Sequence, residues 1–168
     1  MSEEIVNKVA QSKLLTFNLE DYYPEGKRVH IDIKDWLHEG IVLREKDFRQ
    51  SVNGHDWEQY QDAYVALSCS TEAIVPVWAY MLITTCLQPY ARRVVLGDLQ
   101  VLETVLYELE LGKINPDSFR DKSVIIKGCS KKPVPPNAYM QATFMLQGVA
   151  KSIFYGEACS SVPLFKRK

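Results

Sequence analysis

Two cysteines and two carboxylates stand at matching places in the sequence and, with a third cysteine that has no counterpart, are the first candidates for chemistry. Cys69 and Cys129 each follow an apolar run of strand length, Asp98 and Glu157 each follow a glycine after a later run, and Cys159 lies two residues beyond Glu157. Thiolates combined with a carboxylate suit the tetrahedral preference of zinc. The pattern predicts a transition-metal site, with zinc as the favoured cofactor and iron as the alternative. Asp98 or Glu157 would be the fourth ligand or the base for a bound water.

The same thiols admit two other interpretations. Free cysteine is among the most buried residue types, so ordinary packing competes with metal binding. A nucleophilic thiol needs a nearby base or helix dipole, and the three histidines, His30, His38 and His55, all lie in the N-terminal third of the chain. Cys86 lies inside an apolar helical run, where a role in the core is expected.

A short basic loop surrounds the second of these cysteines. Residues 127–132 read Lys-Gly-Cys-Ser-Lys-Lys, and such a loop at the end of a strand is able to hold a phosphate or a carboxylate. Its glycine spacing is not that of a P-loop. A solvated surface loop is the competing interpretation.

Two segments of the chain, 60–98 and 119–157, repeat each other. At an offset of 59, residues 74–98 and 133–157 share 10 identities in 25 positions, among them Tyr80 with Tyr139 and Gly97 with Gly156. Two tyrosines at equivalent points near helix starts are expected to pack between helix and sheet. The repeat predicts an internal duplication in which each copy is one supersecondary unit.

Each copy is expected to fold as a strand, a Cys-Ser loop, a helix and a returning strand. The predicted strands are 64–68, 93–96, 123–127 and 152–155, the helices 77–87 and 137–147, and an amphipathic helix at 99–111 links the copies. A helix between two strands of one sheet makes those strands parallel. The sequence therefore predicts a single domain, 1–168, with a three-layer α/β fold, a mostly parallel sheet built from both copies, and N-terminal elements over 1–58. All five candidate ligands would then lie at one edge of that sheet.

The composition limits the classes of partner. Lys and Arg number 20 against 21 Asp and Glu, a net charge of −1, so no global field attracts nucleic acid or anionic lipid. The longest apolar run, 73–83, is too short for a membrane helix. The acidic start of the chain lacks the pattern of a secretory signal, and a cytoplasmic location is expected.

Several motifs resemble one bacterial family, called domain of unknown function 2480. They are Cys69-Ser70, Ala79-Tyr80-Met81, Lys127-Gly128-Cys129-Ser130 and the run from Ser152 to Leu164, and the resemblance extends from Glu4 to the C-terminal lysines. The family name itself states that no function is assigned, so the resemblance implies no activity and no site residue.

Two functions from different classes fit these observations. The first is a small intracellular metal-binding protein using Cys69, Cys129 and Cys159. The second is a non-enzymatic binding or assembly module that recognises a protein, a small molecule or a small anion. Assembly into a homo-oligomer is compatible with either. Whether the protein is an enzyme, and which reaction it would catalyse, does not follow from the sequence.

Overall fold

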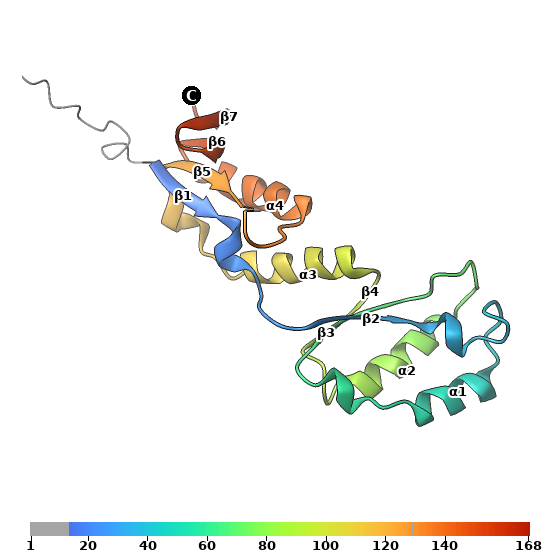
Figure 1. Ribbon diagram of the computed structural model, residues 1–168. Coiled ribbons are helices and arrows are strands. Elements are labelled where there is room, and N and C mark those ends of the chain that lie inside the picture. The colour runs from blue at the N-terminus through green and yellow to red at the C-terminus, as the bar shows by residue number, and fades with distance from the viewer. Residues whose placement is uncertain (1–13, 129) are drawn as a thin grey trace, which may run out of the picture. The chain divides into compact units, whose positions relative to one another are not determined.

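A computed structural model describes residues 14–128 and 130–168 of the chain (Figure 1). The residues form two compact units. The central unit is Glu25–Leu106, and the terminal unit combines the chain through Pro24 with Tyr107–Lys168. The single domain expected from the sequence stays a prediction, and each unit is described by itself.

The central unit is a three-layer α/β structure. Its parallel strands have the order β2-β3-β4. Successive side chains of a strand point to opposite faces, so Val65 and Leu67 of β3 join the core formed with α1 and α2, while Ala66 packs against Leu102 and Leu106 of α3. In chain order the elements are β2 (Arg28–Asp32), η2 (Ile33–Trp36), α1 (Glu45–Gly54), η3 (Glu58–Tyr60), β3 (Tyr64–Ser68), α2 (Val77–Leu87), β4 (Arg93–Leu96) and α3 (Leu99–Leu111), whose last residues belong to the terminal unit.

The terminal unit has a four-stranded sheet of order β1-β5-β6-β7, in which only β7 is antiparallel to its neighbour. Its core joins Phe17 of β1 and Val124 of β5 to Leu146 of α4 and to the end of α3. The elements are β1 (Leu14–Asn18), η1 (Leu19–Tyr22), η4 (Pro116–Phe119), β5 (Ser123–Lys127), α4 (Pro136–Gln147), β6 (Ser152–Glu157) and β7 (Ser160–Lys166).

The repeated segments have the same order of elements, a strand, a helix and a strand, as the repeat predicts, and a 3-10 helix precedes the first strand of each. Asp62 and Asp121 precede the first strands with the same left-handed backbone, φ 57° in both. Each donates its N–H to a carbonyl that follows the helix, that of Tyr90 or Val149. The likeness supports the duplication, which remains an interpretation.

The expectation that both copies contribute to one sheet is wrong, because the structure contains two sheets. The physical reason lies in the strands before each copy. β2 pairs with β3, and β1 pairs with β5, so each first strand of a copy already has a neighbour on both sides.

Within the described chain, no helix is long and apolar enough to cross a membrane.

Candidate binding groove

The structure places the five predicted metal ligands on two different sheets. Cys69 follows β3 and Asp98 follows β4 in the central unit, whereas Glu157 ends β6 and Cys159 lies between β6 and β7 in the terminal unit. Cys129 lies outside the described residues. The expectation of one shared sheet edge is therefore wrong, because the two halves of the set follow strands of separate sheets.

Three of the four described members of the set have local partners, and Cys159 is exposed. Asp98 caps α3 by accepting the N–H groups of Gln100 and Val101, both at 2.9 Å, which satisfies two of the free donors at a helix start. Glu157 pairs with Lys127 at 3.4 Å, and the Cys69 Sγ lies 3.3 Å from the Thr71 hydroxyl. Among residues 14–128 and 130–168, no three His, Cys, Asp or Glu side chains form a group that could hold a metal ion.

The remaining cysteine and two of the histidines also have structural surroundings. Cys86 is half-buried against the central core, which agrees with the packing role expected for it. His30 Nε2 lies 2.7 Å from the Ser68 hydroxyl, and His55 Nε2 lies 2.7 Å from the Tyr60 hydroxyl. Both contacts join a histidine to a hydroxyl group rather than to a thiol.

A carboxylate from the preceding strand region holds each Cys-Ser loop. In the terminal unit, Glu20 accepts the N–H groups of Ser130 and Lys131, the latter at 2.7 Å. In the central unit, Asp32 accepts the Ser70 N–H at 3.1 Å. The loop amides that a small anion would need at residues 130 and 131 are thus bonded to Glu20, which supports a structural role for the basic loop.

These hydrogen bonds hold the pKa of both carboxyl groups well below the ordinary range. Donation by the Lys131 N–H, followed by Ser130, lowers the pKa of Glu20 from 4.5 to about 2. Partial burial raises the pKa of Asp32, but hydrogen bonds from Ser70 and Lys34 outweigh it and lower the value from 3.8 to about 2. A carboxyl whose pKa is lower in the folded chain stabilises the fold above its ordinary pKa, and that stabilisation is lost as the pH falls toward 2.

We therefore expect the free energy of unfolding to decrease as the pH falls from the ordinary carboxyl range, 4.5 for Glu20 and 3.8 for Asp32, toward 2. Glu20→Gln and Asp32→Asn should each be less stable than wild type at neutral pH and should show a shallower loss in acid, because an amide does not titrate. Urea unfolding at stepped pH measures both effects. Glu72→Gln, at an exposed side chain, is the control; equal slopes for all four proteins would contradict the expectation.

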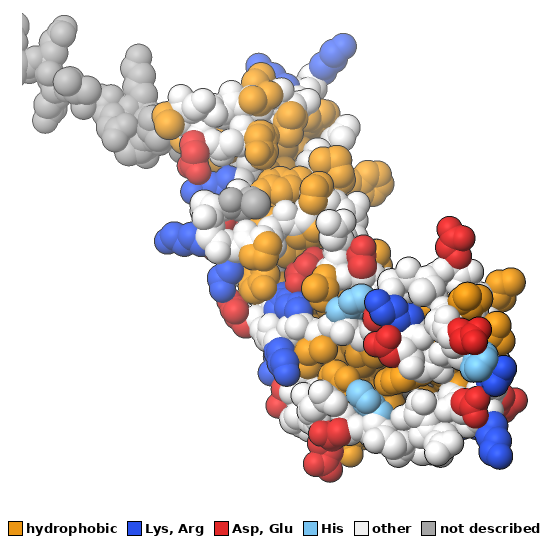
Figure 2. All heavy atoms as spheres, turned by 45° about the vertical axis from the view of Figure 1, so that its right-hand side comes forward, with side chains coloured by type: hydrophobic (Ala, Val, Ile, Leu, Met, Phe, Trp, Pro, Cys, Tyr) orange, Lys and Arg blue, Asp and Glu red, His pale blue; other side chains and the backbone are white. Residues whose placement is uncertain are grey.

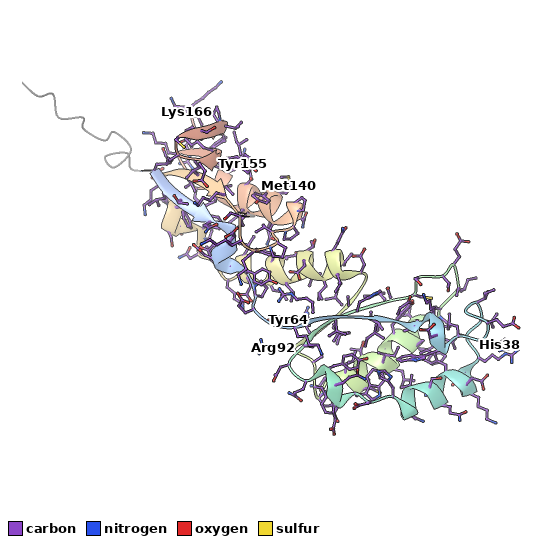
Figure 3. All side chains as sticks on the ribbon, viewed as in Figure 1. His38, Tyr64, Arg92, Met140, Tyr155 and Lys166 are labelled. Atoms are coloured by element: carbon purple, nitrogen blue, oxygen red, sulfur yellow. The ribbon has the colours of Figure 1, made fainter. Side chains whose placement is uncertain are left out.

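The terminal unit has an apolar groove of about 500 Å³ beside α4. Its walls come from β5, the loop before α4, α4 itself, β6 and β7. Figure 3 shows Met140 on α4 and Tyr155 on β6, two residues of the lining. The lining consists of Ile126, Val134, Pro136, Tyr139, Met140, Thr143, Tyr155 and Leu164.

The polar side chains of the lining are Tyr139, Thr143 and Tyr155. The Thr143 hydroxyl donates to the Tyr139 carbonyl at 2.7 Å, one helical turn earlier. The rings of Tyr139 and Tyr155 meet edge to face at 5.9 Å, a favourable arrangement for aromatic pairs. The groove therefore presents mainly apolar and aromatic surface.

Apolar side chains continue beyond the groove on both sides. On α4, Met140 is 63% exposed and Phe144, one turn later, is 88% exposed; both also line a second hollow of about 350 Å³. On β7, Val162 and Leu164 are more than half exposed. Hydrophobic side chains are visible over this part of the terminal unit, in the upper half of Figure 2. An apolar strip thus runs from α4 across the groove to β7.

Sequence reasoning missed this groove because it did not predict β7. The repeated Tyr-Met pair, Tyr80-Met81 and Tyr139-Met140, identified two residues of the groove from the sequence. Tyr139 packs between helix and sheet, as expected. The wall formed by Leu164 requires the hairpin of β6 and β7. Its local signal is the run Val162-Pro163-Leu164-Phe165, which is apolar and follows the turn at 158–159 closely.

Comparisons with known proteins identify the family of this chain but assign it no activity. No curated protein matches the chain, and no solved structure matches it. One family profile matches residues 3–167, nearly the whole sequence. The chain therefore belongs to the family described as "Protein of unknown function (DUF2480)", as its motifs predicted.

Proposed function

We propose that this protein is a binding module that holds an apolar segment of a partner protein in the groove between α4, β6 and β7. The observation that carries the proposal is the groove itself, about 500 Å³ with a mainly apolar lining. Binding sites are concave, mostly apolar and marked by a few polar groups. The tyrosine pair supplies the kind of side chain that is enriched where proteins meet.

A protein segment fits better than a free small molecule because the apolar surface does not end at the rim. Phe144 on α4 and Val162 on β7 are exposed apolar residues outside the lining, and a small ligand seated in the groove would leave them uncovered. Scattered exposed apolar residues need no explanation, whereas a contiguous strip of them marks an interaction site. One aromatic or branched side chain of the partner would enter the groove, and its neighbours would cover Phe144 and Val162.

The size of the groove sets the expected strength of binding. Full burial of one large apolar side chain contributes about 1.5–3 kcal/mol, which alone is too little for stable association. Contacts along the strip must therefore contribute as well, and we expect dissociation constants in the micromolar range, roughly 1–100 µM.

Selection from a phage-displayed peptide library tests the proposal. We expect purified full-length protein to enrich peptides with a shared aromatic or aliphatic anchor. Met140→Lys should weaken the binding of the enriched peptides by roughly tenfold or more, because a charged amine would replace an apolar wall of the groove. Isothermal titration of synthetic peptides measures the change.

Met81 provides a matched control in the central unit. It occupies the equivalent position of α2 and has the same exposed fraction, 63%, so Met81→Lys introduces the same charge on a similar helix face. We expect this variant to bind the selected peptides as wild type does. A library without a shared anchor, or equal losses in the two variants, would overturn the proposal.

Metal binding through Cys69, Cys129 and Cys159, with zinc or iron as cofactor, stays the alternative from the sequence. Thiolate ligands must lose protons, so bound metal would be released in acid. Elemental analysis of protein made without a chelating tag decides between the alternatives. Stoichiometric metal that is lost in Cys129→Ser and kept in Cys86→Ser would favour metal binding. Wild-type protein that never holds metal would favour the binding module.

A further inference from the structure

The outer edge of β4 is the feature that the proposed function does not use. In the described part of the central unit, β4 pairs with β3 and has no strand on its other side. The equivalent strand of the terminal unit, β6, is covered there by the antiparallel strand β7. The structure thus shows one copy of this edge paired and the other open.

The backbone of β4 has hydrogen-bonding groups available at that edge. Gly97, just after the strand, donates its N–H to the Leu67 carbonyl of β3. Backbone groups alternate between the two sides of a parallel strand, so in the register of β3 with β4 those of Val94 and Leu96 point to the open edge. A strand that presents unpaired N–H and C=O groups is a template for pairing with another chain.

The side chains of β4 make the edge apolar. Val94 and Leu96 lie on the α2 face of the sheet, since they stand beside the core residues Val65 and Leu67. Val95 lies on the α3 face. Leu96 is 58% exposed. A hollow of about 290 Å³ lies next to Val94 on the α2 side, lined by Thr84, Gln88, Ala91, Arg92, Arg93 and Val94.

We propose that this edge pairs with the same edge of a second copy of the chain. The two β4 strands run antiparallel about a twofold axis at Val95, which faces Val95 of the second copy. In that register Leu96 of each copy lies opposite Val94 of the other and enters its hollow. The product is a continuous six-stranded sheet with α2 of both copies on the same face.

Self-complementarity is the reason for choosing a second copy as the occupant. A twofold interface places the same patch on both sides, and directly opposite residues of an antiparallel pair share a face. Centring the pair on Val95 satisfies this rule, matches Val94 with Leu96 twice, and puts Arg93 opposite Gly97, which has no side chain. No two like charges face each other in this register.

Two of the three other outer strands carry features that oppose such pairing. β7 contains Pro163 and ends at Lys166, and β2 carries Arg28, His30 and Asp32. Proline and charged side chains protect sheet edges from association, and the run Val94-Val95-Leu96 of β4 contains neither. The third outer strand, β1, also contains neither, and β4 is chosen over it because its exposed Leu96 matches the hollow beside Val94 of a second copy.

Sedimentation equilibrium of the full-length protein tests the proposal. We expect wild type to form a dimer at micromolar concentration. Leu96→Lys should raise the dissociation constant by roughly a hundredfold or more, because its ammonium group would enter a hollow of the second copy that is lined by Arg92 and Arg93, where like charges repel. The monomer should keep its circular dichroism spectrum, since the side chain is exposed in a single copy. Ile41→Lys, at an exposed residue after η2, is the matched control and should dimerise as wild type does.

Val94→Pro is a second variant that does not depend on a substitution at position 96. Proline is compatible with an edge strand when its missing N–H would face outward, so the folded monomer should persist while the pairing is lost. A wild-type protein that stays monomeric, or a dimer that survives both Leu96→Lys and Val94→Pro, would overturn the proposal. Neither outcome bears on the groove beside α4, which belongs to the terminal unit.

Discussion

Leu146→Ala is expected to lower the free energy of unfolding of the terminal unit by about 2–5 kcal/mol. Leu146 of α4 is completely buried and packs in the core with Phe17, Val124 and Ile153. Truncation removes apolar contacts and leaves a cavity that the surrounding strands fill only in part. Leu87→Ala is the matched change in α2, where the equivalent leucine is also completely buried in the central core.

The distribution of tryptophan separates the two effects. All three tryptophans, Trp36, Trp57 and Trp78, belong to the central unit, so their fluorescence follows that unit, whereas far-ultraviolet circular dichroism follows both. In urea titrations, Leu87→Ala should move the fluorescence transition to lower urea, and Leu146→Ala should move the dichroism transition. Met81→Ala and Met140→Ala, at exposed positions of the same helices, should change either midpoint little. A Leu146→Ala protein as stable as Met140→Ala would contradict the assigned core.

Gly97→Ala is the second change with a large expected effect, a loss of roughly 2–4 kcal/mol. Gly97 joins β4 to α3 with φ +145°, a conformation that L side chains rarely adopt. A Cβ atom there would lie 2.7 Å from the Cβ of Val101, on the first turn of α3. Backbone strain and a contact too short for two carbon atoms therefore both lower the free energy of unfolding. Thermal or urea unfolding of the purified variant measures their combined effect.

Gly54→Ala is the control for this prediction. Gly54 ends α1 without a positive φ, and nothing lies within 4 Å of a Cβ built on it. We expect a change within about 1 kcal/mol, since alanine loses less conformational entropy than glycine on folding. If Gly97→Ala and Gly54→Ala proved equally stable, the backbone described at Gly97 would be wrong.

The sequence by itself determined the local elements of this protein. The strands 64–68, 93–96 and 123–127 and the helices 77–87 and 99–111 have the predicted bounds. Alternation of apolar residues, the prolines before the helices and the glycines after the strands act over a few residues, so they can be recognised without knowing the fold. The shared element order of 60–98 and 119–157 followed from the same local signals.

Only the tertiary structure decided which strands pair. Nothing in Leu14–Asn18 or Arg28–Asp32 tells which repeated strand each will join, because pairing depends on edges brought together from distant parts of the chain. Once β1 joins β5 and β2 joins β3, the copies belong to separate sheets. Cys69 and Cys159 then follow strands of different sheets, so they do not lie at one sheet edge as the sequence predicted.

The groove depends on tertiary structure for the same reason. Tyr139 and Met140 could be placed on a helix from the sequence, but a helix face becomes a groove only when another element forms its second wall. Here that wall is β7, which the pairing of Ser160–Lys166 with β6 brings opposite α4. Local sequence therefore determined which side chains are apolar, and long-range strand pairing decided whether those side chains are buried or left open to a partner.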